Sequence, residues 1–396
     1  KLYTTMRISI NYVVMSVLII IFTAKYTENM NAIYIWQQTD WPNFTWDDAK
    51  LSYKLGKVRG LQGKLVGKMS ALGFDLKNSA ILDTLTADIT KSSEIEGEIL
   101  NSDQVRSSVA RHLGIETEGL PEADRYVDGV VQLMMDATQN YMKPLTDERL
   151  FNWHAALFPT GRSGMYKITV ADWRQGVEPM QVISGAMGKE KVHYQAPDSD
   201  NIPFQMKLFL DWVNDDQKID PVLKAAIAHL WFVTIHPFDD GNGRIARTIM
   251  DLFLARADEM PHRFYSMSAE IRKQRKGYYE ILEKTQKGGV DITGWLEWFL
   301  DCLEAALVNT EKSISTVLQK AAFWDRYRLV SMNERQIKMV NLLWDGFDGK
   351  LTSSKWGKIT KCSADTALRD IQDLMTKGVL HKTDEGGRST NYELVM

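Results

Sequence analysis

The chain has 396 residues, of which 44% are hydrophobic and 25% charged, so it is long enough for roughly two or three globular domains. Its net charge of -3 excludes a global electrostatic preference for nucleic acid or anionic membranes. The two cysteines, Cys302 and Cys362, are far apart in sequence, which argues against a disulfide framework or a zinc site. We therefore expect a protein of a reducing compartment, the cytoplasm.

Residues 1–29 form an apolar extension that leaves three interpretations open. The stretch from Ile8 to Ala24 carries no charge, but it is slightly short for a membrane-spanning helix. Lys1 and Arg7 would suit the basic end of a signal peptide. The third interpretation is upstream or added sequence. A membrane anchor at residues 8–24 thus stays open beside the cytoplasmic expectation.

A helical N-terminal domain is predicted for residues 30–115. Four aromatic side chains precede a polar helical pattern that starts at Asp47, and we expect them to hold this segment against the rest of the domain. They are Trp36, Trp41, Phe44 and Trp46.

A short pattern near the end of this domain places Ser92 and Glu96 four residues apart, on one face of a helix. Gly97 follows, where a helix would end. Taken alone, the pattern is more typical of a solvated helix. Glu94 and Glu98 lie on other faces and are weaker candidates for a role.

A helical hydrophobic pattern reaches residue 158, and the pattern after it is typical of short strands. Val182–Ile183 and Val192–Tyr194 predict two short strands around a glycine-containing turn. Two helices follow, Pro203–Asn214 and Pro221–Ile235, each with proline near its start.

The most informative stretch is the loop after that second helix. Its glycines, Gly241 and Gly243, flank Asn242 and let backbone N–H groups approach an anion. The next helix would present its N-terminus to the same anion. Arg244 and Arg247 are three residues apart, so both can reach phosphates from one helix face.

Two further side chains give this loop chemistry. Asp240 supplies a hard oxygen ligand suited to a Mg²⁺ ion that bridges phosphates. His236 has a near-neutral pKa in its ordinary state, which suits removal of a proton from a nucleophile. The loop therefore predicts a phosphate site with a base at its edge.

The run His236-Pro-Phe-Asp-Asp-Gly-Asn-Gly-Arg-Ile-Ala-Arg247 resembles the Fic motif at every fixed position. The resemblance implies a mainly α fold, with a helical catalytic core at residues 116–310 and a short β-hairpin flap. It also implies transfer of AMP from ATP, with Mg²⁺, to a Ser, Thr or Tyr hydroxyl of a target protein or of the chain itself. Gly243 favours nucleotidyl transfer over the kinase chemistry of Doc-type relatives.

The resemblance assigns roles to named residues. His236 is the expected base and Asp240 the expected metal ligand. The expected nucleotide-binding residues are Gly241, Asn242, Gly243, Arg244, Arg247, Tyr278 and Tyr279. The expected flap residues, which dock the target, are Val182, Ile183, Ser184 and Gly185. The pattern of Ser92, Glu96 and Gly97 matches the inhibitory helix of many Fic proteins, in which the glutamate pairs with the second arginine, Arg247 in this chain.

The sequence from Met30 resembles the usual beginning of one group of Fic proteins, which favours the third interpretation of residues 1–29. We expect a linker helix at residues 311–332. Residues 333–396 follow with three helices and two strands, an order similar to a winged helix-turn-helix. Lysines and arginines make that domain locally basic, but Asp365, Asp370 and Asp373 on its third helix argue against tight phosphate contact.

Three alternatives stay open. The chain could act as a DNA-binding regulator through residues 333–396, although DNA is not expected as the main partner. The same fold could remove AMP, or transfer another phosphate-containing group. A homodimer is compatible with the resemblance, which does not fix the oligomeric state.

Overall fold

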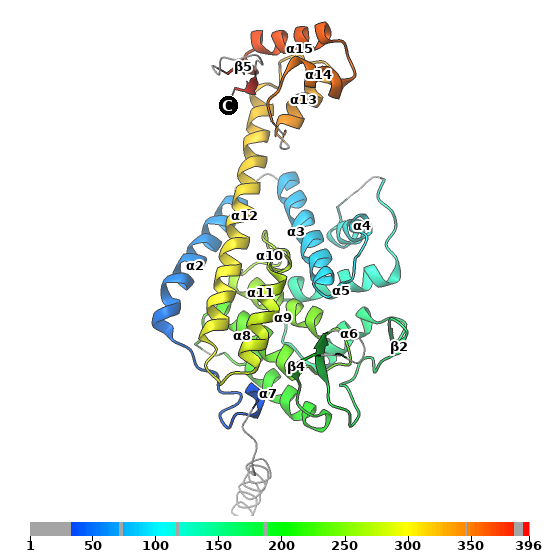
Figure 1. The fold of residues 1–396 in the computed structure, drawn as a ribbon, viewed down its shortest axis with the longest axis vertical. Coiled ribbons are helices and arrows are strands. Elements are labelled where there is room, and N and C mark those ends of the chain that lie inside the picture. The colour runs from blue at the N-terminus through cyan, green and yellow to red at the C-terminus, as the bar shows by residue number, and fades with distance from the viewer. Residues whose placement is uncertain are drawn as a thin grey trace, which may run out of the picture. The chain divides into compact units, whose positions relative to one another are not determined.

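The computed structural model describes residues 33–70, 74–115, 119–184, 189, 191–216, 218–344, 347, 349–383 and 391–395. Within these ranges the chain is mainly helical, as predicted, with three short two-stranded antiparallel sheets (Figure 1). No helix in the described part has both the length and the apolar character to cross a membrane. The predictions for residues 1–29 and for Gly185 lie outside the described residues.

The chain divides into two compact units after Leu307. The helices of the first unit are η1 (Ile35–Gln37), α2 (Asp48–Ser70), α3 (Phe74–Ile95), α4 (Ser102–Leu113), α5 (Arg125–Gln139), α6 (Asp147–Leu157), η2 (Ser199–Asn201), α7 (Ile202–Asn214), α8 (Pro221–Ile235), α9 (Asn242–Asp258), α10 (Met267–Lys273), α11 (Arg275–Gln286) and the first part of α12 (Thr293–Arg326). Its strands are β1 (Arg162–Ser163), β2 (Tyr166–Lys167), β3 (Gln181–Ser184) and β4 (Lys191–Gln195).

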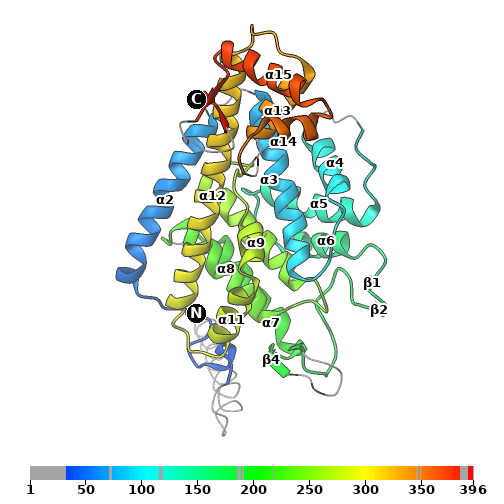
Figure 2. The same cartoon turned by 45° about the horizontal axis from the view of Figure 1, so that its top comes forward.

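Helices α8 and α9 form the centre of the first unit, between α2 and α12 on one side and α3 and α5 on the other (Figures 1 and 2). Nearly every side chain of α8 is buried, which explains why its sequence is apolar on all faces. Pro221 stands at its first turn, and Asp220 caps it by accepting from the Val222 N–H at 2.8 Å. The loop between α8 and α9 is thereby held on a rigid pair of helices.

Three of the four N-terminal aromatic residues hold their segment against the first unit, as predicted, whereas the Trp46 indole donates to the nearby Asp48. Trp36 Nε1 donates to the Gln195 carbonyl at 2.8 Å, and Trp41 Nε1 donates to Gln205 Oε1 at 2.9 Å. The rings of Trp41 and Phe44 meet the buried Trp231 edge to face, with centroids 6.0 and 5.5 Å away. The segment that precedes α2 therefore also braces the end of strand β4.

A buried charge cluster joins α3 to α9. The guanidinium of Arg263 contacts Asp88 Oδ2 of α3 at 3.0 Å and Asp251 Oδ1 of α9 at 2.6 Å, and all three side chains are almost fully buried. Asp88 also accepts from Ser266 Oγ at 2.5 Å, at the start of α10. Burial raises the pKa of Asp251. The guanidinium of Arg263 therefore holds α3 and α9 together through two buried carboxylates.

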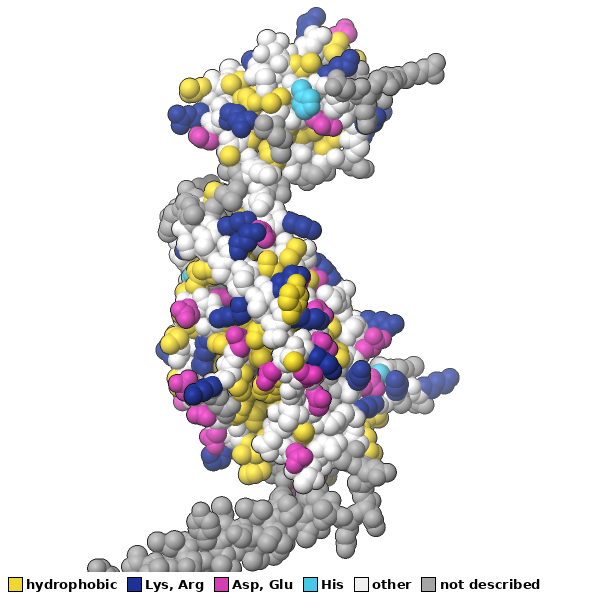
Figure 3. Space-filling model, turned by 90° about the vertical axis from the view of Figure 1, so that its left-hand side faces the viewer, with side chains coloured by type: hydrophobic (Ala, Val, Ile, Leu, Met, Phe, Trp, Pro, Cys, Tyr) yellow, Lys and Arg dark blue, Asp and Glu magenta, His cyan; other side chains and the backbone are white. Residues whose placement is uncertain are grey.

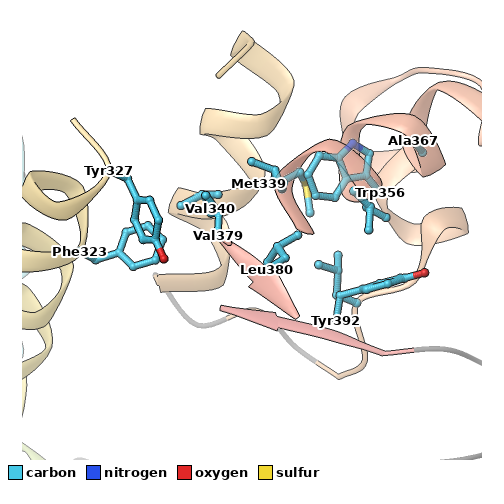
Figure 4. Packing of buried hydrophobic residues seen from close by; sticks show 12 residues of the cluster. Phe323, Tyr327, Met339, Val340, Trp356, Ala367, Val379, Leu380 and Tyr392 are labelled. Carbon is cyan, nitrogen blue, oxygen red and sulfur yellow. The ribbon is translucent and has the colours of Figure 1, made fainter. Parts of the chain in front are cut away.

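The second unit contains the rest of α12 and three further helices, α13 (Glu334–Trp344), α14 (Ser353–Thr360) and α15 (Ala364–Thr376). Strands β5 (Leu380–Lys382) and β6 (Tyr392–Leu394) pair antiparallel. Its core gathers Trp356, Met339 and Leu380 with neighbouring apolar side chains (Figure 4). The elements follow the predicted order of three helices and two strands, and residues 384–390 between the strands lie outside the described residues.

The structure corrects one interpretation of α15. Asp370 is 5% exposed and accepts from Arg335 Nε at 2.8 Å and from Asn333 Nδ2 at 2.9 Å. Asp373 accepts from Gln336 Nε2 at 2.8 Å. Both carboxylates thus contact α13, but only Asp370 is buried, because the Asp373 side chain is 45% exposed and also pairs with Lys377. On the molecular face in Figure 3, acidic and basic side chains are interspersed, and DNA binding stays a prediction.

We predict that Arg263→Met lowers the free energy of unfolding by about 3–5 kcal/mol, because it leaves two buried carboxylates without their cation. Urea denaturation of the full chain measures this. Lys207→Met is the matched control, since the Lys207–Asp211 pair is 71% and 64% exposed, and we expect a change below about 0.5 kcal/mol. Equal effects of the two substitutions would contradict the assignment.

Candidate active site

The loop between α8 and α9 is folded by its own backbone and by one amide side chain. Helix α8 ends at Ile235, and the next residue, His236, adopts the left-handed conformation with φ 54° and donates its N–H to the Phe232 carbonyl at 3.0 Å. Asn242 is buried, accepts from the Phe238 N–H at 3.0 Å and donates to the Phe238 carbonyl at 2.8 Å. The side chain of Asn242 therefore closes the loop, and its backbone N–H, at the start of α9, is what it offers an anion.

The imidazole of His236 is oriented by the main chain. Its Nδ1 lies 3.2 Å from the Val233 carbonyl, so the hydrogen bond places the proton on Nδ1 and presents Nε2 as an acceptor. Burial lowers the pKa of His236, and the positive charge of Arg174 lowers it further against the raising effects of Glu96 and Asp240. The ring is held as a neutral base.

Arg174 is a residue that the sequence reasoning missed. It is 4% exposed, and its Nε donates to the His236 carbonyl at 2.8 Å. Its backbone N–H donates to the Pro237 carbonyl at 2.8 Å, and its guanidinium also donates to the Pro197 carbonyl. Arg174 thus fixes the first residues of the loop. The residues next to Arg174 in the sequence do not indicate this role, because all of its partners lie more than twenty residues away in the chain.

The two aspartates of the loop differ in their surroundings. Asp239 Oδ2 accepts from the Thr169 N–H at 2.8 Å, which ties the loop to the segment after β2. Asp240 Oδ1 accepts from the Gly241 N–H at 2.6 Å, its Oδ2 accepts from Ser163 Oγ, and its side chain is 42% exposed. The Asp240 carboxylate therefore remains partly open to solvent.

Asp240 fits the expected Mg²⁺ as a single protein ligand. Within the described ranges no three His, Cys, Asp or Glu side chains are grouped to hold a metal ion. Mg²⁺ commonly takes one or two carboxylates and completes its shell with water and substrate phosphates. One exposed, hydrogen-bonded carboxylate beside a phosphate loop agrees with that mode of binding.

Arg244 already has a carboxylate partner. Its NH1 donates to Glu98 Oε2 and to the Tyr126 hydroxyl, both at 2.7 Å, and its guanidinium lies 5.1 Å from the centroid of the Phe158 ring. Burial raises the pKa of the Tyr126 phenol, so that phenol stays protonated and donates to Glu98. Glu98, a weaker candidate from the sequence, therefore pairs with one of the two arginines of the motif.

Arg247 is fully buried and is held by the end of α3. Its NH2 lies 2.8 Å from Glu96 Oε1, its Nε donates to Ser92 Oγ at 2.9 Å, and its NH2 also donates to the Ser92 carbonyl at 2.9 Å. Helix α3 ends at Ile95, so Glu96 stands in the turn that follows, where Gly97 has φ 91°. The pairing of Glu96 with Arg247 that the resemblance implies is present in the structure.

Gly243 lies directly beneath the Glu96 carboxylate. A Cβ atom built on Gly243 would be 2.1 Å from Glu96 Oε1, closer than any real contact allows. The absence of a side chain at this position therefore lets the carboxylate reach the backbone at the N-terminal turn of α9. That turn attracts anions through its N–H groups and helix dipole. Glu96 occupies a place suited to a phosphate.

A pocket of about 720 Å³ opens beside this pair. Its wall includes Glu96, Gly243, His236, Tyr278, Tyr279 and the flap residues Val182, Ile183 and Ser184. Tyr278 is 1% exposed, and its hydroxyl lies 2.9 Å from His229 Nε2. Tyr279 is 37% exposed, and its hydroxyl donates to the Ile95 carbonyl at 3.2 Å. Tyr279 therefore offers the more accessible of the two rings.

The flap is the β3–β4 hairpin, whose register shifts between Val182 and Ile183. Its base is anchored to the core, because the Tyr194 hydroxyl donates to the Thr234 carbonyl at 2.6 Å. The side chains of Val182 and Ile183 are 36% and 54% exposed. The hairpin thus offers partly apolar side chains beside the pocket.

Comparison with known sequences gives two matches along the chain. Residues 144–254 match the Fic/DOC family, and residues 34–115 match a domain of unknown function, DUF4172. A protein adenylyltransferase Fic of Drosophila willistoni is 26% identical over 231 residues, which are 55% of this chain and 40% of that protein. One of Culex quinquefasciatus is 37% identical over 114 residues, which are 28% and 21% of the two chains. The matched part thus spans less than half of these relatives.

Two solved structures are similar to this chain at low identity. A Fic family protein from Desulfovibrio desulfuricans is 20% identical, with a TM-score of 0.47, and the match covers 86% of this chain and 96% of the other. A Fic domain containing signaling protein from Bacteroides thetaiotaomicron is 21% identical, with a TM-score of 0.48, and the match covers 64% and 94%.

Arg174 generates a prediction about pH. Arg174→Met removes a charge that lowers the pKa of His236, so the acid limb of the pH–rate profile moves to higher pH. The substitution also removes the hydrogen bond to the His236 carbonyl. The loop between α8 and α9 then shifts, and we expect the rate of the reaction at this site to fall by about 10²-fold. Arg174→Lys keeps the charge and loses the forked geometry, so its rate falls while its acid limb stays in place. An acid limb that moves equally in both variants argues against the electrostatic role.

Proposed function

The chain belongs to the Fic family through its domain at residues 144–254, and on that premise we propose that it is a protein adenylyltransferase whose activity Glu96 restrains. One observation carries the proposal. The base His236, the amide-rich turn at Gly243 and the flap strand β3 all border a single pocket. A nucleotide and an acceptor segment would meet there at the imidazole.

In this proposal the triphosphate of ATP lies along the backbone N–H groups of residues 241–243, with the guanidiniums of Arg244 and Arg247 at its side. An acceptor segment of a target protein pairs with the edge of the flap. Nε2 of His236 takes the proton of the acceptor hydroxyl while its oxygen attacks the α-phosphorus and pyrophosphate leaves. Asp240 would hold Mg²⁺, which supplies positive charge to the phosphates when bound.

Restraint follows from the position of the Glu96 carboxylate. While it pairs with Arg247, that guanidinium and the turn at Gly243 already have an anion beside them. A triphosphate must displace this carboxylate, because two anions in one site repel each other. Coupling of about 1–3 kcal/mol between the pair and the nucleotide corresponds to roughly a 5- to 150-fold change in occupancy. The proposal therefore gives the wild-type chain a low basal activity.

We predict that Glu96→Gly raises self-modification at least about tenfold, because the nucleotide then meets an unoccupied Arg247. Incubation with labelled ATP and Mg²⁺, followed by mass spectrometry of the modified chain, measures both the rate and the transferred group. Glu94→Gly is the matched control, since it makes the same change two residues away, where the carboxylate contacts Lys91 and Arg272. Equal labelling of the wild type and the Glu96→Gly variant would remove the inhibitory role.

A second prediction concerns the base. In the Glu96→Gly background, His236→Ala is expected to lower AMP transfer to acceptors outside the β3–β4 hairpin by about 10²–10⁴-fold and to leave nucleotide binding intact, because the imidazole takes a proton and binds no phosphate. Labelled transfer and equilibrium binding of ATP are compared in the same preparation. His112→Ala, on the exposed face of α4, is the control. Undiminished transfer after His236→Ala rules out the role of the base.

A further inference from the structure

Three side chains at the mouth of the pocket form a hydrogen-bonded relay. The hydroxyl of Ser184, the last residue of β3, lies 2.6 Å from Nε2 of His193 on β4. Nδ1 of the same imidazole lies 2.6 Å from Glu283 Oε2 on α11. All three residues line the pocket that also contains His236 and Gly243. Neither the phosphate loop nor the inhibitory turn contributes to this relay.

The direction of the relay follows from Glu283. A salt bridge from Lys287 at 2.7 Å, together with His193, lowers the pKa of Glu283 to about 2, so the carboxylate is ionised and only accepts hydrogen bonds. His193 must therefore donate from Nδ1, which leaves Nε2 as an acceptor in the neutral ring. The Ser184 hydroxyl is then the donor, and its proton points at a base.

This is the arrangement by which a weak hydroxyl nucleophile is activated. A carboxylate fixes the tautomer and orientation of an imidazole, and the imidazole receives the hydroxyl proton as the oxygen attacks. A brace between the flap and α11 needs only the His193–Glu283 contact. The relay adds an exposed serine hydroxyl beside the proposed nucleotide pocket.

We propose that Ser184 is an acceptor of AMP on the chain itself, with His193 as its base. The inference rests on the proposed function, which supplies ATP to this pocket. Ser184 Oγ attacks the α-phosphorus and forms the Oγ–P bond, the bond from that phosphorus to the bridging oxygen of the β-phosphate breaks, and pyrophosphate leaves. The hydroxyl proton passes to Nε2 of His193. The product is a seryl-AMP ester at the end of β3.

The modification would act on the flap. Ser184 follows Val182 and Ile183 on the strand expected to dock the target. A bulky, negatively charged nucleotide on this residue would stand beside that edge and hinder a second main chain from pairing with it. The chain would thus limit its own access to other acceptors once its flap is modified.

Peptide mapping by mass spectrometry tests the proposal. The full chain with Glu96→Gly is incubated with ATP and Mg²⁺, and AMP is expected on the peptide that contains Ser184. Adding His193→Ala is expected to lower the occupancy of Ser184 at least about tenfold relative to other modified sites in the same sample. Glu283→Gln, which keeps the shape of that side chain, is expected to act in the same direction.

Chemical rescue separates proton transfer from mere support of the flap. Free imidazole added to the His193→Ala chain is expected to restore part of the Ser184 modification, whereas a lost brace would not respond to it. The label that remains in the Glu96→Gly, His236→Ala chain is expected on Ser184, because His193 serves that hydroxyl.

AMP on other residues with Ser184 unmodified would overturn this inference and leave the proposed function standing. Absence of AMP from the whole chain, with Ser184 included, would overturn both. Modification of Ser184 that is insensitive to His193→Ala would overturn the role of the relay.

Discussion

The ion pair between Glu96 and Arg247 is the contact on which the organisation of this site depends. It joins the end of α3 to the first turns of α9 and places a carboxylate against the backbone of Gly243, with Oε1 2.8 Å from the guanidinium. Arg247 and the backbone of Gly243 form an anion-attracting place, since a buried arginine and a helix N-terminus meet there. Under the proposed function, this one carboxylate decides whether the site is open to a phosphate.

The rest of the first unit is anchored independently of Glu96, so the Glu96 carboxylate can move without displacing α3. Asp88 and Asp251 hold α3 against α9 through Arg263, deep in the core, and Ser92 adds hydrogen bonds to Arg247. Glu96 itself stands beyond the last residue of α3 and is 33% exposed. Its release therefore requires movement of one turn and leaves the buried cluster in place. A helix anchored in this way can serve the fold and the restraint together.

The sequence alone was enough to predict site residues that lie close together in the chain, but not contacts made between distant segments. The phosphate loop could be found because its glycines, its arginines and His236 lie within twelve residues, and hydrophobic period predicted the flanking helices. The contacts of Arg174, Ser163 and Tyr126 come from segments far away in the chain, and no local pattern encodes them. The direction in which a helical side chain points could not be predicted from the sequence either. Asp370 on α15 lies in a helical pattern that looks solvated, but tertiary packing turns it toward Arg335.

The pocket holds two imidazoles that the fold controls in different ways. His236 is oriented by the Val233 carbonyl and by the Arg174 side chain, which donates to the His236 carbonyl at the rigid junction of α8 and α9, so its position does not depend on the flap. His193 is oriented by a carboxylate on α11 and sits on the flap itself, so any movement of the hairpin changes its contact with Glu283. A base fixed to the core suits acceptors that arrive from outside. A base carried by the flap can serve only a hydroxyl that moves with it, and Ser184 is that hydroxyl.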